Sequence, residues 1–350
     1  MSTPQTFTNC NDLTRLPYFE MNTDGKPVLA LEDAPPIVDF HTHLGSSFYL
    51  SRPIDLFRRT DAVHHCFRHD ELPIDLSLYS GVNLRNTRRN GTFSDHAHTI
   101  FTNKGANATY TIPNIIEEMD RMGVEKSVVL AIDLPGGSNN SLRQAKYLQG
   151  NPRLIPFCAI NVNARRWEEE LEQCLAMGAR GLKVHPYAQF LPPNHPKMMR
   201  LYKRWSRTGL PILFHTANNG LEPSFLRKLS DMELYEEPLK KFTEIPFILG
   251  HAGMLFYETA VEYAKAHGNT CLEIGGQPPQ NIQRMIDTLG NDKILFGTDW
   301  PFYPIILPLA KALVATDKDR ESRDLILSGN AFRLIRQYNL CGNAPLAQAV

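Results

Sequence analysis

The strongest constraint on the fold of this chain is an alternation of eight short apolar runs with segments of helical periodicity. Each run has the length of a β-strand, and most end in a polar or ionisable residue. Continuous apolar strands between helices are typical of a parallel sheet whose outer face is covered. The runs occupy residues 37–43, 124–133, 153–160, 181–186, 211–216, 246–251, 270–276 and 293–301.

The segments between the runs place apolar residues at intervals of three and four, as amphipathic helices do. Several end in glycine just before the next run, which is common at helix C-termini. Eight such strand–helix units closed on themselves form a (β/α)8 TIM barrel, and this is the predicted fold. An open doubly wound sheet is the alternative, but it usually carries a glycine-rich phosphate loop after its first strand. Here the first strand ends in HTHLG. The clearest helical segments are 112–123, 165–179, 196–209, 257–268 and 280–290.

Two regions depart from the regular spacing within what we expect to be one domain of 350 residues. Residues 1–35 form an N-terminal extension ahead of the first strand. Residues 44–111 form an insertion far longer than an ordinary strand–helix connection. Because it follows strand 1, topology places it over the catalytic face of a barrel, where it would act as a lid or cap. The alternative is an excursion that only decorates the fold or forms oligomers.

Composition excludes several classes of function. Thirty-seven basic residues balance thirty-seven acidic ones, so no global field favours nucleic acid or an anionic membrane. The first twenty residues of the sequence lack the basic start and apolar run expected of a secretory signal, and we find no stretch of about 18 apolar residues that could span a bilayer. Its six cysteines are dispersed without a CxxC pair, which indicates reduced thiols. We therefore expect a cytoplasmic protein with a small-molecule substrate and no nucleic-acid or membrane partner.

Ionisable residues gather at the ends of the predicted strands. In a TIM barrel the C-terminal strand ends open into one mouth, so groups far apart in sequence converge there. Residues i and i+2 of a strand face the same side, which lets both histidines of strand 1 point inward. The residues concerned are His41 and His43 of strand 1, Lys183 and His185 of strand 4, His215 of strand 5, His251 of strand 6 and Asp299 of strand 8.

These residue types point jointly to a divalent metal. A single buried histidine is more often a hydrogen-bonded core residue than a ligand, and an isolated HxH says little more. Several histidines and an aspartate at the ends of different strands are harder to explain as core residues. Imidazole nitrogen and carboxylate oxygen suit zinc and similar first-row ions.

The motifs VDFHTH, GLKVHP, PILFHT, ILGHAG and ILFGTDWP resemble the amidohydrolase-related branch of the amidohydrolase superfamily. That branch includes metal-dependent hydrolases and nonoxidative decarboxylases related to aminocarboxymuconate-semialdehyde decarboxylase. The resemblance implies a distorted TIM barrel with one divalent ion, commonly zinc, with manganese as the alternative. It implies His41, His43, His215 and Asp299 as metal ligands, and His251 as a catalytic acid or base. Dimers are common among proteins similar to this one, so a homodimer is a further expectation.

Lys183 leaves the number of metal ions open. Elsewhere in the superfamily a strand-4 lysine is carboxylated and bridges two metals, and His215 and His251 would then bind the second ion. In mononuclear relatives this lysine or the following histidine contacts substrate. We favour one ion, with Lys183 and His185 on the substrate side. The alternative for Lys183 is an ion pair with a buried acid such as Glu273.

The predicted function is hydrolysis of an amide, ester or lactone by a metal-activated water, with Asp299 taking the proton and His251 stabilising the oxyanion. Nonoxidative decarboxylation of a small (aromatic) carboxylic acid is the alternative. For that reaction Arg85, Arg88 and Arg89 could receive the substrate carboxylate, although a solvated loop is the plainer interpretation. A noncatalytic metal-binding barrel represents another class of function.

Two other local features allow more than one interpretation. Trp300 could line the pocket or pack behind its strand. His64, His65 and His69 could form a second metal site or a histidine cluster in the insertion without a ligand role.

Overall fold

A closed barrel of eight parallel strands forms the centre of the computed structural model, which describes residues 6–47, 53–65, 73–87, 105–136, 138–218 and 224–342. One group of strands pairs in the order β4-β6-β7, and a second in the order β8-β9-β10-β11-β12. The parallel bridges Cys158–Leu182 and Thr42–Trp300 join the two groups at both edges. The strands are β4 (Ile37–Thr42), β6 (Val124–Leu130), β7 (Leu154–Phe157), β8 (Leu182–Val184), β9 (Ile212–His215), β10 (Phe247–Gly250), β11 (Thr270–Glu273) and β12 (Ile294–Leu295).

The predicted TIM barrel is thus confirmed, and each of the eight apolar runs contains one barrel strand. Burial on both faces explains why the runs are continuous and do not alternate. Every residue of β4, β7, β8 and β10 is buried, because the interior face packs inside the barrel and the outer face against helices.

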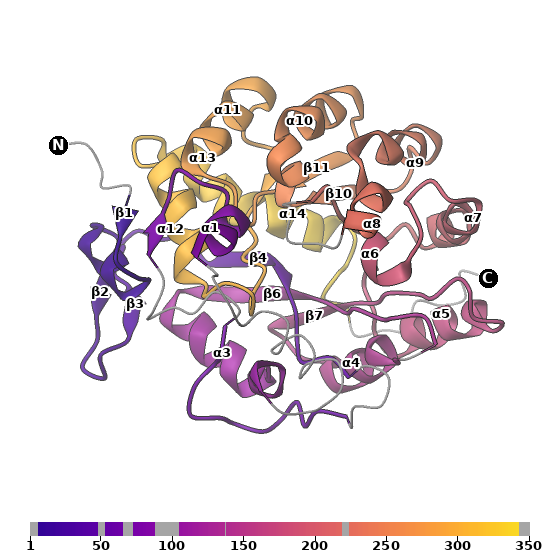
Figure 1. Ribbon diagram of the computed structural model, residues 1–350, viewed down its shortest axis with the longest axis horizontal. Helices are drawn as coiled ribbons and strands as arrows, with labels where there is room; N and C mark the ends of the chain where they lie inside the picture. The colour runs from indigo at the N-terminus through magenta and orange to yellow at the C-terminus, as the bar shows by residue number, and fades with distance from the viewer. Residues whose placement is uncertain are drawn as a thin grey trace.

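Helices surround the barrel on its outside (Figure 1). The five helical segments expected from periodicity appear as α3 (Ile112–Arg121), α5 (Trp167–Ala176), α7 (Pro196–Trp205), α10 (Tyr257–Ala266) and α11 (Pro279–Leu289). The layer also contains α4 (Asn140–Leu148), α9 (Glu236–Lys241), α12 (Ile306–Ala315), α13 (Arg320–Asp324) and α14 (Asn330–Gln337). Short helices in the connections are α6 (Pro186–Gln189), η3 (Ser206–Thr208), α8 (Ser224–Arg227), η4 (Lys228–Ser230), η5 (Met232–Tyr235), η6 (His251–Phe256) and the π-helical η7 (Leu325–Gly329).

The N-terminal extension packs against the side of the barrel. It contains β1 (Thr6–Phe7), η1 (Asn11–Arg15) and the antiparallel hairpin of β2 (Phe19–Met21) with β3 (Pro27–Leu29). Contacts join η1 to α12 and β3 to α3. The Tyr18 hydroxyl also donates to Asp317 beyond α12, at 2.5 Å. These contacts cover α12, whose residues are almost all buried.

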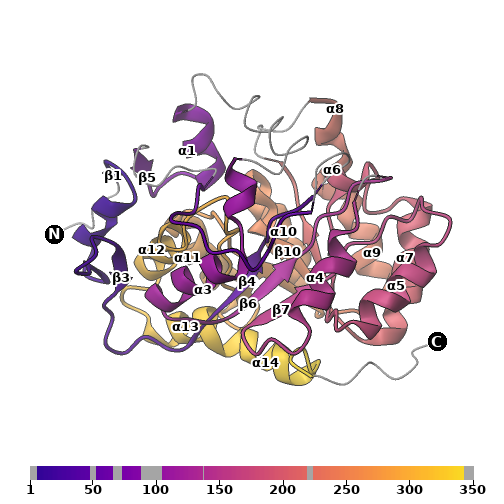
Figure 2. The ribbon, with the colours of Figure 1, turned by 90° about the horizontal axis from the view of Figure 1, so that it is seen from below.

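The insertion after strand 1 lies over one end of the barrel. Its described parts include β5 (Ile74–Asp75), α1 (Ser80–Thr87) and η2 (Ala106–Thr109). Figure 2 shows β5 and α1 at the same end of the molecule as α8, opposite α14. β5 pairs antiparallel with β1, so the extension and the insertion form one two-stranded sheet. Within the described residues, no helix is long and apolar enough to cross a membrane.

Candidate metal centre

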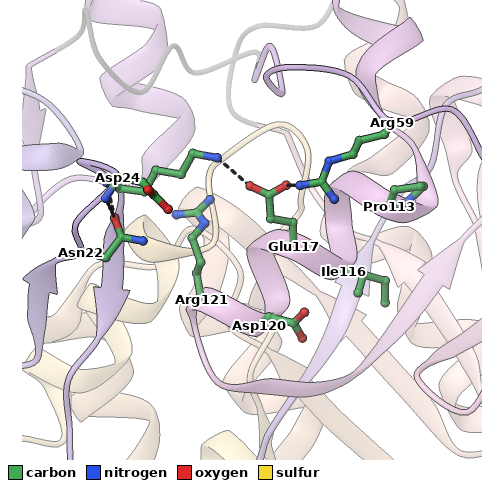
Figure 3. A pocket seen from close by; sticks show the side chains of 9 residues that line it. Asn22, Asp24, Arg59, Pro113, Ile116, Glu117, Asp120 and Arg121 are labelled. Carbon is green, nitrogen blue, oxygen red and sulfur yellow. Dashed lines mark hydrogen bonds and ion pairs between the residues drawn. The ribbon is translucent and has the colours of Figure 1, made fainter.

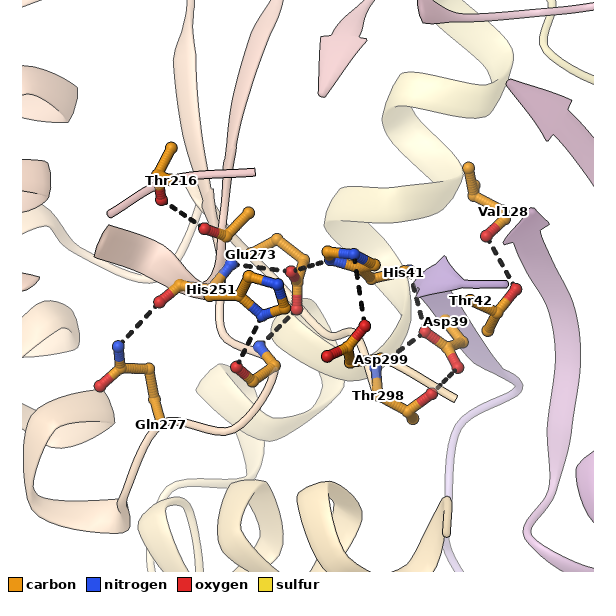
Figure 4. A network of polar contacts seen from close by, with 12 residues as sticks. Asp39, His41, Thr42, Val128, Thr216, His251, Glu273, Gln277, Thr298 and Asp299 are labelled. Atoms are coloured by element: carbon orange, nitrogen blue, oxygen red, sulfur yellow. Dashed lines mark hydrogen bonds and ion pairs between the residues drawn. The ribbon is translucent and has the colours of Figure 1, made fainter. Parts of the chain in front are cut away.

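Three barrel-strand ends bring a group of possible metal ligands together. His41 lies near the end of β4, His251 directly follows β10, and Asp299 lies in the loop after β12. One ligand atom from each lies within 4.8 Å of the others. Figure 4 shows this group, with the Glu273 carboxylate between His41 and His251.

The two histidines of the HxH motif are each held by Nδ1. His41 Nδ1 lies 2.6 Å from Glu273 Oε2, and His43 Nδ1 lies 2.7 Å from the Leu130 carbonyl oxygen. Their Nε2 atoms lie 3.7 Å and 3.3 Å, respectively, from the same Asp299 Oδ1. Both side chains therefore present Nε2 to one carboxylate, which is the arrangement that the i, i+2 spacing predicts.

His185 and His215 form a second pair in the mouth. Their rings stack with centroids 4.0 Å apart and an angle of 9° between planes. His185 Nδ1 and His215 Nε2 are buried and have no hydrogen-bond partner among the described residues. Burial lowers the pKa of both imidazoles well below the usual value, and neighbouring ionisable groups lower it further. Each ring is therefore neutral, with a nitrogen still available to a ligand.

Two further buried carboxylates lie beside the group. Burial raises the pKa of Glu273 to about 8 despite N–H donors from His251 and Gly275, and Asp299 raises it further. Burial likewise raises the pKa of Asp39 to about 7, although Thr298 donates to it twice and the His41 N–H once. Three acidic groups in so small a buried volume would be stabilised by a cation.

Two glycines make room for this arrangement. A Cβ on Gly297 would collide with the Glu273 carboxylate, and one on Gly250 would lie 3.3 Å from His41 Cε1 and 2.5 Å from the Phe214 carbonyl oxygen. The glycines of GTDWP and ILGHAG thus allow strands to approach the metal-ligand candidates closely.

His251 is held in an unusual backbone conformation. His251, Ala252, Gly253 and Met254 have consecutive φ values of 59°, 44°, 76° and 50°. Non-glycine residues in this region cost about 1 kcal/mol or more each, so neighbouring contacts must hold them there. Gln277 Nε2 donates to the carbonyl oxygens of His251 and Met254, each at 2.8 Å.

The same turn fixes the His251 ring. Its Nδ1 lies 3.2 Å from the Gly275 carbonyl oxygen, which accepts a hydrogen bond and requires Nδ1 to carry the proton. Burial lowers the pKa of His251 to about 4, with Asp299 opposing this shift and Lys183 adding to it. At neutral pH His251 is therefore a neutral imidazole with an unprotonated Nε2.

Asp299 and Lys183 complete the mouth. Asp299 also has a positive φ, 60°, and its N–H donates to the His41 carbonyl oxygen at 2.8 Å. Lys183 has no exposed surface, and its Nζ lies 3.2 Å from His41 Nε2. Burial lowers the pKa of Lys183 to about 7, although Asp299 and Glu273 oppose the shift. Glu273 directs its oxygens to His41, His251 and Gly275, and its influence on the pKa of Lys183 is electrostatic.

The donor set fits a divalent metal ion. His41 and His43 offer Nε2 beside a carboxylate, and the buried Nε2 of His215 has no described partner. Outer carboxylates and carbonyls orient the imidazoles, as they do at metal sites. The three residues whose ligand atoms lie within 4.8 Å of one another are His41, His251 and Asp299. The ligand set expected from the sequence contains His43 and His215 and leaves His251 out. The choice among these histidines remains a prediction.

The remaining predicted site residues lie in different places. Trp300 is fully buried, and its indole N–H donates to Glu118 on α3, so it packs behind its strand. Arg85 belongs to α1, and only the backbone of this residue is described. The other two arginines of the predicted basic cluster, Arg88 and Arg89, lie outside the described residues. His69 of the predicted histidine cluster lies outside them as well.

Sequence reasoning missed most of the residues that support the site. It named Glu273, which closes strand 7, only as a possible partner of Lys183 and not as the carboxylate that holds His41. Asp39 precedes His41 by two residues on the same strand. Nothing in the sequence marks Gln277 or Glu118, because their partners are backbone or side-chain groups of distant loops.

A separate groove of about 590 Å³ lies outside this mouth, between the β2–β3 turn and α3 (Figure 3). Three basic and three acidic residues line it, so its charges balance. Glu117 binds Lys26 at 2.6 Å and Arg59 at 2.5 Å. Because the charges that line the groove balance and Glu117 is paired with two of them, the groove favours neither an anionic nor a cationic ligand.

Comparison with known proteins agrees with the architecture. A family model described as Amidohydrolase matches residues 38–337. A comparison with curated proteins found no significant match. Among solved structures, an uncharacterised TIM-barrel protein from Bordetella bronchiseptica has a TM-score of 0.60 at 17% identity, covering 87% of this chain and 99% of that chain.

Two solved structures with named activities are also similar. The 2,6-dihydroxybenzoate decarboxylase from Rhizobium has a TM-score of 0.53 at 17% identity, covering 87% of this chain and 100% of its own. A probable 2-pyrone-4,6-dicarboxylic acid hydrolase from Acinetobacter baumannii has a TM-score of 0.52 at 13% identity, covering 86% and 99%. At these identities the likeness shows a shared fold.

Proposed function

The chain belongs to the amidohydrolase family, and from that premise we propose that it is a metal-dependent hydrolase of a small-molecule ester, lactone or amide. The family and the group of His41, His251 and Asp299 support a metal-dependent enzyme. The choice of hydrolysis goes further and rests on one observation, the state and placement of His251.

His251 is built as a base. Its Nδ1 proton is committed to the Gly275 carbonyl oxygen, and its lowered pKa keeps the ring neutral. The unprotonated Nε2 can therefore accept a proton from water beside His41 and Asp299, which hydrolysis requires. Stabilisation of an oxyanion by the same nitrogen, the role that the sequence predicts for His251, would need a proton there.

The proposed metal ligands are His41, His43, His215 and Asp299, with one zinc ion. A divalent ion in this group supplies Lewis-acid chemistry, which makes water more acidic and polarises an oxygen of the substrate. Asp299 lies close to both Nε2 atoms of the HxH motif, where it can bind the ion and pass a proton from water to His251. Lys183 and His185 line the mouth as groups that can contact substrate.

Metal removal tests the site directly. In purified His215→Ala we expect loss of the zinc that wild type carries, about one equivalent, because Nε2 of His215 becomes unavailable. Elemental analysis by plasma mass spectrometry measures the content before and after chelation. Equal zinc in wild type and variant would refute His215 as a ligand. About two equivalents in wild type would instead favour a second ion at a carboxylated Lys183.

Nonoxidative decarboxylation is the second candidate, and Lys183 favours it. This buried lysine has a pKa of about 7, so it can deliver a proton to carbon after carbon dioxide leaves. The similar Rhizobium structure is that of a decarboxylase named for 2,6-dihydroxybenzoate. An aromatic carboxylic acid is the substrate class that this candidate predicts.

A substrate screen separates the two candidates. Zinc-loaded protein is incubated in isotopically labelled water with lactones, esters, amides and hydroxylated aromatic acids, and products are examined by mass spectrometry. A product that gains the elements of labelled water supports hydrolysis. A product that has lost carbon dioxide supports decarboxylation. In the first case His251→Asn should lose activity, and in the second Lys183→Met should lose it.

A further inference from the structure

We propose that Glu118, a residue of α3 outside the metal-ligand candidates, is a positioning residue for Asp299. This inference rests on the proposed function, because it assigns Asp299 a place in a metal centre. The proposed role of Glu118 is to hold the loop after Asp299 in place, without contacting substrate or metal.

One carboxylate holds both ends of the loop that follows Asp299. Glu118 Oε2 accepts the indole N–H of Trp300 at 3.0 Å, and Oε1 accepts the backbone N–H of Ile305 at 2.7 Å. Trp300 directly follows Asp299, and Ile305 is the residue before α12. Movement of this loop therefore requires that one or both bonds to Glu118 break.

The Trp300 end of the loop is connected to the metal-ligand candidates through the backbone. Trp300 accepts from the His43 N–H at 2.6 Å, and Asp299 donates to the His41 carbonyl oxygen at 2.8 Å. Asp299 has a left-handed φ of 60°, which an aspartate adopts only when surrounding contacts impose it. The bond from Trp300 to Glu118 is one such contact.

Burial and charge support a specific role for Glu118. Its residue exposure is 4%, and a buried carboxylate destabilises a fold unless several donors satisfy it. A third donor comes from the insertion, where His65 Nε2 lies 3.2 Å from Oε2 and His65 Nδ1 lies 3.0 Å from the Pro301 carbonyl oxygen. Helix, insertion and Asp299 loop therefore meet at this one carboxylate.

The neighbouring Glu117 provides a matched control. It lies on the same helix, and its side chain is 29% exposed. Its partners Lys26 and Arg59 belong to the groove of Figure 3, outside the mouth. Glu117→Gln therefore makes the same chemical change one residue away without touching the Asp299 loop.

The experiment compares zinc binding by the metal-free forms of wild type, Glu118→Gln and Glu117→Gln, by competition with a chromophoric chelator. Glutamine keeps the shape of Glu118 but replaces one acceptor with an NH2 group, which faces an N–H donor. We expect Glu118→Gln to bind zinc about 10-fold more weakly, the lower end of the effect of losing an outer contact at a metal site. Glu117→Gln should bind zinc as wild type does.

A merely structural role would change other quantities. If Glu118→Gln lowers the melting temperature but binds zinc like wild type, the proposal is overturned. Trp300→Phe, which removes only the indole donor, should weaken zinc binding in the same direction. The double variant should then be no weaker than Glu118→Gln alone, and fully additive losses would refute the path through Trp300.

Hydrogen exchange distinguishes failure of this proposal from failure of the proposed function. If wild type binds no zinc, the proposed metal-dependent function fails. The role of Glu118 is then tested by comparing hydrogen exchange of residues 298–305 in wild type and in Glu118→Gln. Selective acceleration there in Glu118→Gln, with the barrel strands unchanged, supports positioning. Acceleration spread evenly over the barrel contradicts it.

Discussion

At the scale of single residues, the candidate centre depends on which nitrogen of each imidazole is hydrogen-bonded to the protein and which one faces the mouth. His41, His43 and His251 each direct Nδ1 to a carboxylate or carbonyl oxygen and leave Nε2 to the mouth. The sequence could predict which histidines converge, because strand ends in a barrel meet. It could not predict this division, because the partners Glu273, Leu130 and Gly275 come from other strands and loops.

Asp299→Asn tests the carboxylate while leaving the fold intact. We expect activity to fall about 1,000-fold, within the range that a proton-transfer group contributes. Asparagine adopts positive φ more readily than most residues, so the loop conformation at 60° should persist. Steady-state kinetics and circular dichroism measure the two effects. Near-wild-type turnover in a folded variant would remove Asp299 from the mechanism.

Glu118 predicts a pH dependence of stability. Burial by itself raises the pKa of Glu118, but the charge and hydrogen bond of His65, with Arg121 and the Ile305 N–H, lower it to about 2. A carboxyl whose pKa is lower when folded stabilises the protein above its unfolded pKa of about 4.5. That stabilisation, about 3 kcal/mol, disappears as pH falls from about 4.5 to 2.

Urea unfolding of wild type and Glu118→Gln at several pH values measures this contribution. The difference in unfolding free energy should be largest above pH 4.5 and shrink towards pH 2. A difference that stays constant across this window would show that the carboxylate does not keep its charge in the fold.

At the scale of elements, the turn after β10 shows what periodicity cannot predict. The run 246–251 predicts a strand that ends at His251, and β10 ends one residue earlier. The four left-handed residues that follow include Ala252 and Met254, whose side chains give no signal for positive φ. The conformation comes from tertiary contacts with Gln277 and Thr216.

Gln277→Met should release this turn. Methionine fills a similar volume but leaves the carbonyl oxygens of His251 and Met254 without their donor, which should cost about 2 kcal/mol of stability. Hydrogen exchange of residues 251–256 should accelerate, and kcat should fall more than KM changes. Gln283→Met, on the exposed side of α11, is the control. Unchanged exchange in the turn would show that other contacts suffice.

At the scale of the whole molecule, the barrel was predictable and the packing of its additions was not. Eight strand-length runs with helices between them determine a closed parallel barrel almost by themselves. The pairing of β1 with β5 involves two residues on each side, Thr6–Phe7 and Ile74–Asp75. Strands of two residues are too short to show a periodic pattern in the sequence. The sequence therefore predicts an extension and an insertion, but not that a strand of one pairs with a strand of the other.

Deletion of residues 1–9 should therefore affect the insertion. The deletion removes β1 and the buried Phe7 side chain, whose burial contributes about 2 kcal/mol. We expect a corresponding loss of unfolding free energy and faster exchange in residues 73–80. A shorter deletion, residues 1–5, leaves β1 in place and serves as control. Equal exchange in both deletions would show that β5 holds its position without β1.

The closure of the barrel determines when its metal site can exist. Asp39 and Thr298, which hold His41 and the Asp299 loop together, are separated by 259 positions in the chain. During synthesis the HxH motif leaves the ribosome long before the strand that carries its carboxylate has been made. A nascent chain can therefore expose histidines to metal, but it cannot assemble the enclosed centre. Capture of the ion in its final geometry must wait until the last strand has met the first.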